Sequence, residues 1–437
     1  MPRRVVLIAV LLSAAVVRPT TALADAVVGT GSAASCTEGA FNTALAVGGT
    51  ITFNCGFAPV TITFTSSKSI TTTITLAGGG LVTLSGGTSI RPFVVSVSGH
   101  LTLDQIKVAN GASVDDGGCL HNSGSLTLVN STVDGCTAPR DGGAIFNASG
   151  GTLALDGADV RNATATRDGG GICDYGSSVV LTNSLVTGNT ASSNGGGIGS
   201  FGSGTMTLTD VTISDNHAPG ADGGGLYRSA SHSQMNVLFD GNTAARGGGL
   251  FNNAGTATVT GASFLSNTVT QEGGGVYNNA GATFTIAVGP NGGEITANDA
   301  VTGGGLRNGG TATLSDITMD SNGATNGGAI ANAAGTLTVN RVTLVSNTAP
   351  SGSGGGIDNS ATATITNSTF SGNGASVGGA LFGRSGSAVL TNVTFAGDTA
   401  TTGGAIDLST GTATLKNTIL AATSGGSCAG AAVTSLG

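Results

Sequence analysis

Charged side chains recur at one position along this sequence, directly before a run of two or three glycines. Carboxylates placed about 5 Å apart on one edge could bind a divalent cation or act as an acid–base pair. Asp116, Asp141 and Asp168 are therefore a candidate Ca²⁺ site. Solvated turn residues are the competing interpretation, because Asp-Gly is a common turn signal. The charged column contains Asp116, Asp141, Asp168, Asn194, Asp222, Arg246 and Glu272.

The second half of this column is a candidate catalytic group. Proton abstraction from an acidic sugar needs carboxylates that hold a cation and a basic residue that accepts the proton. Asp222, Arg246 and Glu272, with Arg228 nearby, form the local grouping of that kind. The four histidines share no metal-ligand spacing, and no other cofactor is expected.

Aromatic residues occupy a second column, one residue after a recurrent aliphatic. Exposed rings in a row can stack on sugar faces, so Tyr227, Phe251 and Tyr277 are candidate glycan-binding residues. The alternative is packing between like residues of neighbouring repeats. The column contains Phe146, Tyr227, Phe251, Tyr277 and Phe382.

Paired threonines form a third pattern, Thr-x-Thr, for example at Thr256/Thr258 and Thr283/Thr285. A flat array of hydroxyl and methyl groups resembles the ice-binding face of β-helical antifreeze proteins. Thr is also a favourable outward residue of a strand. Ice binding is therefore an alternative function.

The columns are spaced by a repeat whose marker is Gly-Gly, then Gly, Ala or Cys, then an aliphatic. Successive aliphatics lie 24 to 30 residues apart, with a mean of 26, which predicts stacked units that contact only their neighbours. The aliphatics are Leu120, Ile145, Ile172, Ile198, Leu226, Leu250, Val276, Leu306, Ile330, Ile357, Leu381 and Ile406.

Each repeat contains three short strands and no helical period. The run Thr205–Asp210 alternates polar and apolar residues, and a shorter run, Val211–Ile213, follows it. Period-two alternation rich in Thr, Val, Ile and Leu indicates strands with one inward face. Three strands per 26 residues predict an all-β, single-stranded parallel β-helix of about 14 coils, in which Ile172, Ile198 and Leu226 stack.

An asparagine recurs once per repeat and predicts a structural ladder. Asn tolerates the left-handed backbone of a tight bend, and its amide can bond the equivalent amide one coil away. Cys136 and Asp398 fill the same position in two coils. The ladder contains Asn162, Asn189, Asn216, Asn242, Asn267, Asn298, Asn322, Asn347 and Asn373.

The GGA-[IL] motif at Gly142–Ile145 and Gly378–Leu381, with F-x-x-N at Phe264–Asn267, resembles the polymorphic outer-membrane protein repeat. More broadly, residues 36–430 resemble secreted bacterial right-handed β-helix proteins of the pectate-lyase-like superfold. The resemblance implies right-handed coiling. It leaves function open among lyases, hydrolases, adhesins and passive surface proteins.

The remaining segments are predicted to be an export signal and the two ends of the β-helix. Residues 1–24 match a signal peptide, 25–59 an N-terminal cap, 60–420 the β-helix, and 421–437 a tail beyond which the natural chain is expected to continue. Cys36 and Cys55 are expected to form a disulfide that stabilises the cap, while the pairing of Cys119, Cys136, Cys173 and Cys428 stays open.

Charge narrows the choice of partners. Without residues 1–24 the chain has 12 Lys and Arg against 23 Asp and Glu, about −11, which argues against nucleic acid and anionic membranes. No second apolar run is long enough to span a bilayer. We therefore expect a monomeric bacterial protein, secreted or at the cell surface or outer membrane. The favoured role is non-enzymatic and adhesin-like, with weak glycan binding; a polysaccharide lyase or hydrolase is the first alternative.

Overall fold

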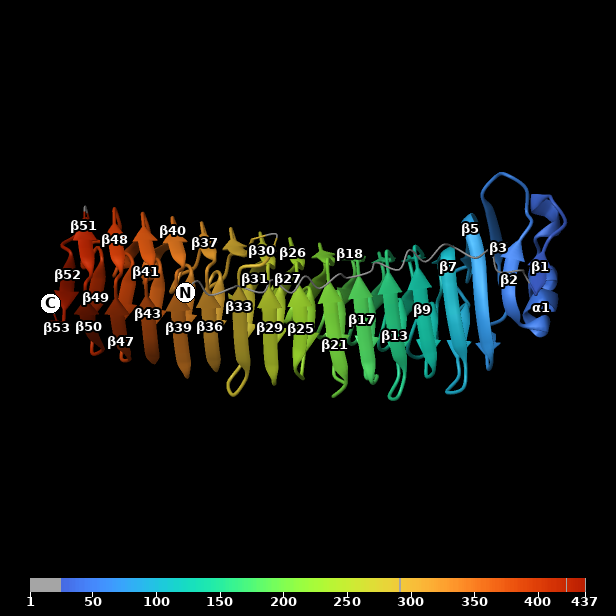
Figure 1. Ribbon diagram of the computed structural model, residues 1–437, viewed down its shortest axis with the longest axis horizontal. Helices are drawn as coiled ribbons and strands as arrows, with labels where there is room; N and C mark the ends of the chain where they lie inside the picture. Colours follow the sequence, from blue (N-terminus) through green and yellow to red (C-terminus); the bar gives the residue numbers. More distant parts are fainter. Residues whose placement is uncertain (1–24, 291, 422, 437) are drawn as a thin grey trace, which may run out of the picture.

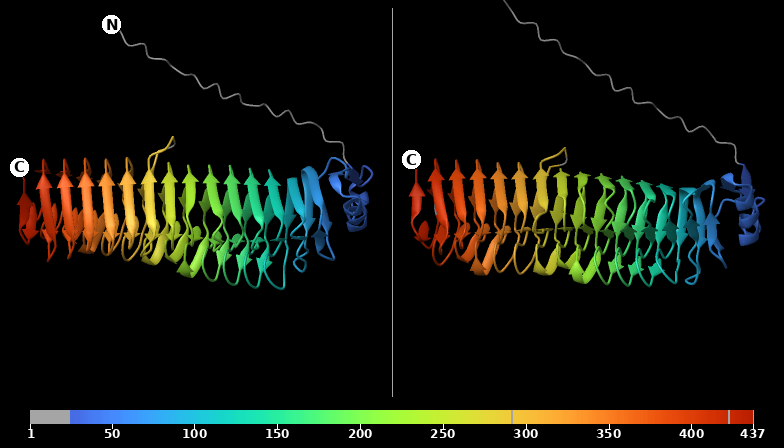
Figure 2. Two further views of the ribbon diagram at one scale, coloured as in Figure 1. Left: turned by 60° about the horizontal axis from the view of Figure 1, so that its bottom comes forward. Right: turned by 90° about the horizontal axis from the view of Figure 1, so that it is seen from below.

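The computed structural model describes residues 25–290, 292–421 and 423–436. They form a straight rod of stacked parallel strands (Figure 1; Figure 2), which confirms the predicted all-β, right-handed parallel β-helix. The expected signal segment, 1–24, lies outside the described residues. Within the described residues, no helix has the length and apolar character needed to cross a membrane.

The cross-section of the rod has three continuous ladders of strands, and a shorter six-stranded ladder, from β11 (Thr137–Ala138) to β31 (Thr268–Glu272), runs beside them. The first is a 15-stranded sheet, and twelve of its members follow the glycine marker. The second and third consist of the long and the short strands of each coil. Both belong to one sheet because β5 (Thr73–Ser85) and β7 (His100–Ala109) run through the bend between them. One coil is represented by β20 (Ile198–Ser200), β21 (Thr205–Thr209) and β22 (Thr212–Ser214).

The 15-stranded sheet positions the candidate site. Its strands are β4 (Lys68–Ile70), β6 (Phe93–Val95), β8 (Leu120–Asn122), β12 (Ile145–Asn147), β16 (Ile172–Asp174), β20, β24 (Leu226–Arg228), β28 (Leu250–Asn252), β32 (Val276–Asn278), β35 (Leu306–Asn308), β38 (Ile330–Asn332), β42 (Ile357–Asn359), β46 (Leu381–Gly383), β49 (Ile406–Leu408) and β52 (Cys428–Gly430).

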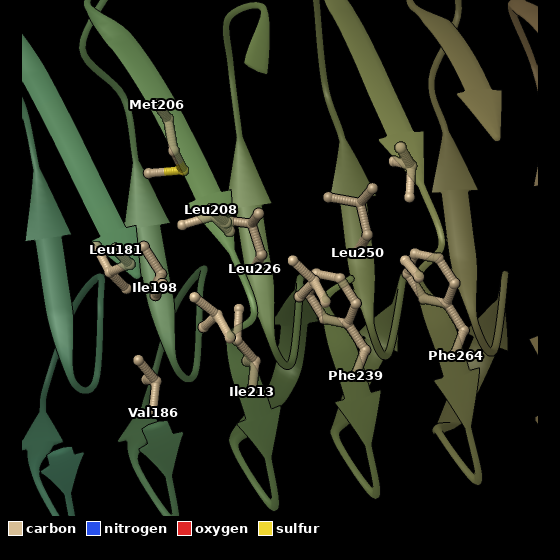
Figure 3. Close-up of a cluster of buried hydrophobic side chains, with 14 of the residues drawn as sticks. Leu181, Val186, Ile198, Met206, Leu208, Ile213, Leu226, Phe239, Leu250 and Phe264 are labelled. Atoms are coloured by element: carbon tan, nitrogen blue, oxygen red, sulfur yellow. The ribbon is translucent and has the colours of Figure 1, made fainter. Parts of the chain in front are cut away.

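The core is a continuous column of apolar side chains. Ile172, Ile198 and Leu226 pair in register from coil to coil, as predicted. Figure 3 shows Leu208, Ile213 and Leu226, which come from three different ladders, pointing into one interior. Because every coil buries the same inward positions, the core extends along the rod and needs no large aromatic centre.

The solenoid is longer than the sequence indicated, with about 16 turns instead of about 14. At the N-terminal end, β1 (Ala26–Val28) pairs with β2 (Gly49–Phe53) within the segment expected as a cap, and β2 pairs with β5. At the other end, β52 and β53 (Val433–Ser435) continue two ladders through the expected tail. These terminal coils lack the glycine marker, so the marker alone underestimates the number of turns.

The helix α1 (Glu38–Val47) lies at the N-terminal end of the rod (Figure 2). The Thr37 side chain caps it by accepting a hydrogen bond from Ala40 N. The Phe41 ring is buried against Phe53, Phe64 and Phe93 of the first coils. A disulfide joins Cys36, just before the helix, to Cys55, just after β2. The helix therefore covers the edge that an uncapped solenoid would expose.

The asparagine ladder runs through the interior from Asn189 to Asn373 and ends on Asp398. Each Asn donates its backbone N–H and its Nδ2 to Oδ1 of the next member; for Asn267 both distances to Asn298 are 2.9–3.0 Å. Asn162 is not a member, because Ala163 takes the buried position and Asn162 Nδ2 donates to Asp134.

The left-handed backbone of this bend lies one residue before the ladder, not on it. Ser266, Ala297 and Ser321 have φ values of 52°, 55° and 55°. The ladder Asn is required for its side-chain hydrogen bonds, since each one satisfies buried backbone groups of neighbouring coils.

Candidate functional site

Two columns of side chains lie beside each other along the 15-stranded sheet. One is the charged column before the glycines, and the other is the aromatic column after the aliphatics. Arg246 of the first lies 5.2 Å from the ring centres of both Phe251 and Tyr277 of the second. Each column also repeats at the strand spacing of about 4.8 Å, so every side chain meets its counterpart in the next coil.

The aromatic column is a stack of rings in contact with one another. Tyr227 and Phe251 have ring centres 5.4 Å apart, and Phe251 and Tyr277 4.6 Å apart. The expectation of exposed rings is wrong for the last two, because only 2% of Phe251 and 4% of Tyr277 is accessible. The column is therefore built by packing between coils, the alternative weighed from the sequence.

Sequence reasoning missed two members of the stack. Tyr175 and Phe201 come three residues after their aliphatics, and they bridge the gap between Phe146 and Tyr227 with ring centres 5.2–5.9 Å apart. Cys173 and Gly199 occupy the ordinary column position in these coils. Both are small, which leaves room for a ring from two residues further along. A small residue in the column followed by an aromatic was the available signal.

Arg246 does not have the properties of a catalytic base. It lies between Asp222 and Glu272 in strand register, and its Nε and Nη2 donate to the two carboxylate oxygens of Asp222 at 2.8 and 2.7 Å. These hydrogen bonds raise the pKa of Arg246 above its ordinary value, so its proton is held more tightly. Glu272 is paired with Arg307 at 3.5 Å. The predicted catalytic group is therefore a set of ion pairs between adjacent coils.

Arg228 lies apart from that group, inside the solenoid. It is fully buried, it lies 3.6 Å from Asp174, and it donates to Ser200 Oγ and Gly204 O. Two further polar side chains of the same irregular coil, His232 and Gln234, occupy inward positions of β25 (His232–Met235). Burial lowers the pKa of His232 to about 4, so it is neutral at pH 7.

The carboxylates of the candidate calcium site are also engaged. Arg167 donates to both oxygens of Asp141, through Nε at 2.6 Å and through Nη2. Asp168 accepts from the backbone N–H and Nδ2 of Asn194 at 2.9 and 3.2 Å, and burial raises the pKa of Asp168. Among the described residues, no group of three or more His, Cys, Asp and Glu is placed to hold a metal ion.

The cysteines left open by the sequence are resolved by the coil geometry. Cys119 and Cys136 form a second disulfide, with Cα atoms 5.6 Å apart. Cys173 is buried and Cys428 exposed, and both are free thiols in the described part of the chain. Burial raises the pKa of Cys173 well above its ordinary value, which makes it a poor nucleophile.

The threonine pairs form two parallel rows on the outer face of the long strands. Thr256, Thr283 and Thr311 align in one row, and Thr258, Thr285 and Thr313 in the other. Their side chains are exposed or half-buried. This surface, the Thr face, continues in register through β39 (Thr336–Asn340) and β43 (Thr362–Thr366).

The coil geometry and a family comparison agree. The family described as right-handed beta helix region matches residues 116–291, which include seven of the twelve glycine markers. The chain therefore has the fold of a right-handed β-helix. The polymorphic outer-membrane repeat stays a resemblance.

Two further comparisons add no functional information about this β-helix. No curated protein matches its sequence. Among solved structures it is similar to PfbA, a surface adhesin of Streptococcus pneumoniae, at 11% identity and a TM-score of 0.27, over 94% of this chain and 92% of that chain. An identity and a TM-score this low carry no argument about function.

Proposed function

We propose that this β-helix is an exported, non-enzymatic rod that makes adhesin-like contacts at a bacterial surface. The observation that carries the proposal is the ion pairing within the charged column. Asp222 and Arg246 pair with each other, as do Asp141 and Arg167, so these groups stabilise the stack of coils and are not poised for catalysis. Catalytic groups would need free carboxylates and a base with a lowered pKa.

The Thr face supports a contact role. It presents the same hydroxyl and methyl groups at every coil, about 4.8 Å apart, along much of the rod. A periodic surface of this kind suits many weak contacts with a repeating partner such as a glycan chain, because linked contacts add up to a useful avidity.

Export is supported by the cysteines as well as by the N-terminal sequence. Two disulfides, Cys36–Cys55 and Cys119–Cys136, lie in the first third of the solenoid. Disulfides persist in oxidising compartments and are rare in the cytosol. The location at a cell surface rests on this chemistry and on the signal-like segment 1–24.

A single experiment separates the contact role from catalysis. The oxidised full chain is incubated with neutral and uronate polysaccharides in the presence of Ca²⁺, and both retention on the immobilised polymer and absorbance of unsaturated uronate product are recorded. We expect retention without product. Product that forms with the wild type and is lost in Arg246→Ala would overturn the proposal in favour of a lyase.

Ice binding is a second candidate function, favoured by the register of the Thr face. Five consecutive long strands, β29 (Thr256–Thr260), β33 (Thr283–Ala287), β36 (Thr311–Ser315), β39 and β43, place their Thr-x-Thr pairs directly opposite one another. The array is interrupted at Ser233 and Val389, which pair with Thr207 and Thr364 respectively.

A further inference from the structure

The aromatic column and the neighbouring charged column both have short side chains at the same level of the rod. In the aromatic column, Arg307, Ala331, Asp358 and Phe382 follow Tyr277 in register. Ala331 therefore stands where the stack would have another large side chain. In the neighbouring charged column, the residues at this level are Thr302 and Asn326, which replace the longer Arg246 and Glu272 of the coils before.

The missing side chain leaves a hollow of about 280 Å³. Thr302, Asn326, Ala331, Asp358, Ser360 and Arg384 line it. On one side, the Arg307 guanidinium leans away from the hollow and lies 4.8 Å from the Tyr277 ring. On the other side, the Arg384 guanidinium lies 5.2 Å from the Phe382 ring and reaches Asp358 in the wall of the hollow.

The size of the hollow matches one ring. Ring centres in the intact part of the stack are 4.6–5.9 Å apart. A coil that lacks a ring therefore leaves free one coil repeat of about 4.8 Å along the stack. Its volume lies at the small end of ligand pockets, which hold roughly 300–1,000 Å³. A single six-membered ring can enter, whereas an extended oligomer could place only one of its units there.

The lining is polar but electrically balanced. Arg384 Nη2 donates to Asp358 Oδ2 at 2.6 Å, and Ser353 Oγ donates to the same oxygen at 2.6 Å. Asp358 is nearly buried, so this network fixes its carboxylate. Because guanidinium and carboxylate cancel, the hollow favours an uncharged ligand over an acid or an amine.

The remaining hydrogen-bonding capacity matches hydroxyl groups. The Asn326 Oδ1 accepts from Ser353, whereas its Nδ2 donates to no other described residue. The amide, the carboxylate and the guanidinium together present donors and acceptors within one wall. The methyl of Ala331 supplies the apolar floor that the C–H face of a sugar ring contacts. An aromatic side chain in the hollow would leave the Asn326 Nδ2 without a partner.

We propose that this hollow binds one neutral hexopyranose residue, whose ring takes the place of the missing side chain between Arg307 and Asp358. Asn326, Asp358 and Arg384 bond its hydroxyls. The inference rests on the proposed contact function and gives it a defined sugar subsite, distinct from the Thr face.

The test uses the oxidised full chain and the methyl glycosides of glucose, galactose and mannose, with binding measured by saturation-transfer NMR and titration. Ala331→Phe fills the hollow with the ring type that the column already stacks, so we expect a folded protein whose affinity falls at least tenfold. Asn326→Ala, which removes a half-exposed amide, should weaken binding severalfold. The matched control is Thr343→Phe, which adds the same ring to an exposed position on another side of the same coil.

The outcomes separate the subsite from the contact role. Loss of sugar binding in Ala331→Phe, with wild-type binding in Thr343→Phe, supports the subsite. Equal binding by all variants places the sugar elsewhere and overturns the inference while leaving the contact function intact. The inference also fails if the wild type adheres to polysaccharide but binds none of the three glycosides. It fails likewise if the wild type adheres to polysaccharide but binds methyl esters of Phe or Tyr in preference to the glycosides. If the wild type neither adheres to polysaccharide nor binds a glycoside, both the subsite and the proposed contact function are wrong.

Discussion

Replacing Asp398 by Asn should stabilise the β-helix at neutral pH and remove a pH dependence. Asp398 is the last member of the buried asparagine ladder. Its Oδ1 accepts from the backbone N–H and Nδ2 of Asn373 at 2.9 and 2.8 Å, while its Oδ2 is buried without a partner among the described residues. Burial raises the pKa of this carboxyl from 3.8 to about 6, against the smaller effect of the hydrogen bonds from Asn373.

The sign of the effect follows from linkage. The folded protein binds the Asp398 proton more tightly than the unfolded chain, so stability falls as the pH rises from about 4 to about 6. A shift of about two units corresponds to about 3 kcal/mol, and this penalty is fully present above pH 6. Asn keeps the acceptor oxygen for Asn373 and carries no charge. The variant should therefore gain up to about 3 kcal/mol at pH 8 and almost nothing at pH 4.

The assay is urea unfolding followed by circular dichroism from pH 4 to pH 8. Since solenoids can unfold coil by coil, amide exchange of the Asn373 N–H gives the local free energy in parallel. Asp156→Asn is the control, because it removes the same charge from an exposed position. A difference between wild type and Asp398→Asn that stays constant across this pH range would refute the reasoning, as would a variant less stable at pH 8.

Three further outcomes are expected. Asn267→Ala leaves the Asn242 N–H and the Phe239 carbonyl without partners, and should cost about 2–4 kcal/mol in urea unfolding; a loss below 1 kcal/mol would contradict the structural role of the ladder. Removal of the Cys119–Cys136 disulfide, which links residues 17 apart, should cost about 3 kcal/mol in the same measurement, and no loss would show that the bond adds nothing. If the Thr face binds ice, Thr285→Tyr with Thr313→Tyr abolishes crystal shaping without changing the circular dichroism; absence of shaping by the wild type rejects that function.

The coil itself could be predicted because its signals are local and repeated. The inward alternation of Met206 and Leu208 and the stacking of Ile198 on Ile172 follow from period two along a strand and period 26 along the chain. Neither pattern depends on contacts between distant parts of the sequence. The number of turns depended on the ends, where β2 and β52 pair normally although their sequences lack the marker.

The exposure of the site residues could not be predicted, because it depends on the neighbouring column. Tyr277 points outward from its strand, yet the guanidinium groups of Arg246 and Arg307 lie over its ring and contribute to its burial. The period of the repeat does not indicate that side chains of the charged column lean toward those of the aromatic column. For the same reason the hollow at Ala331 was not apparent, since it requires short residues in both columns at one level.

Regular stacking explains why charged columns of a β-helix make poor evidence of catalysis. A side chain in such a column always has counterparts about 4.8 Å above and below it, so acids and bases placed in successive coils neutralise one another. Asp222 and Arg246 show the result, a bidentate ion pair that fixes both groups. Side chains remain available to bind a ligand where this pairing between coils is interrupted and solvent can enter. The side chains of Arg228 and His232 are buried in the core, whereas the hollow at Ala331 opens to the surface beside polar side chains, which is why we place the ligand there.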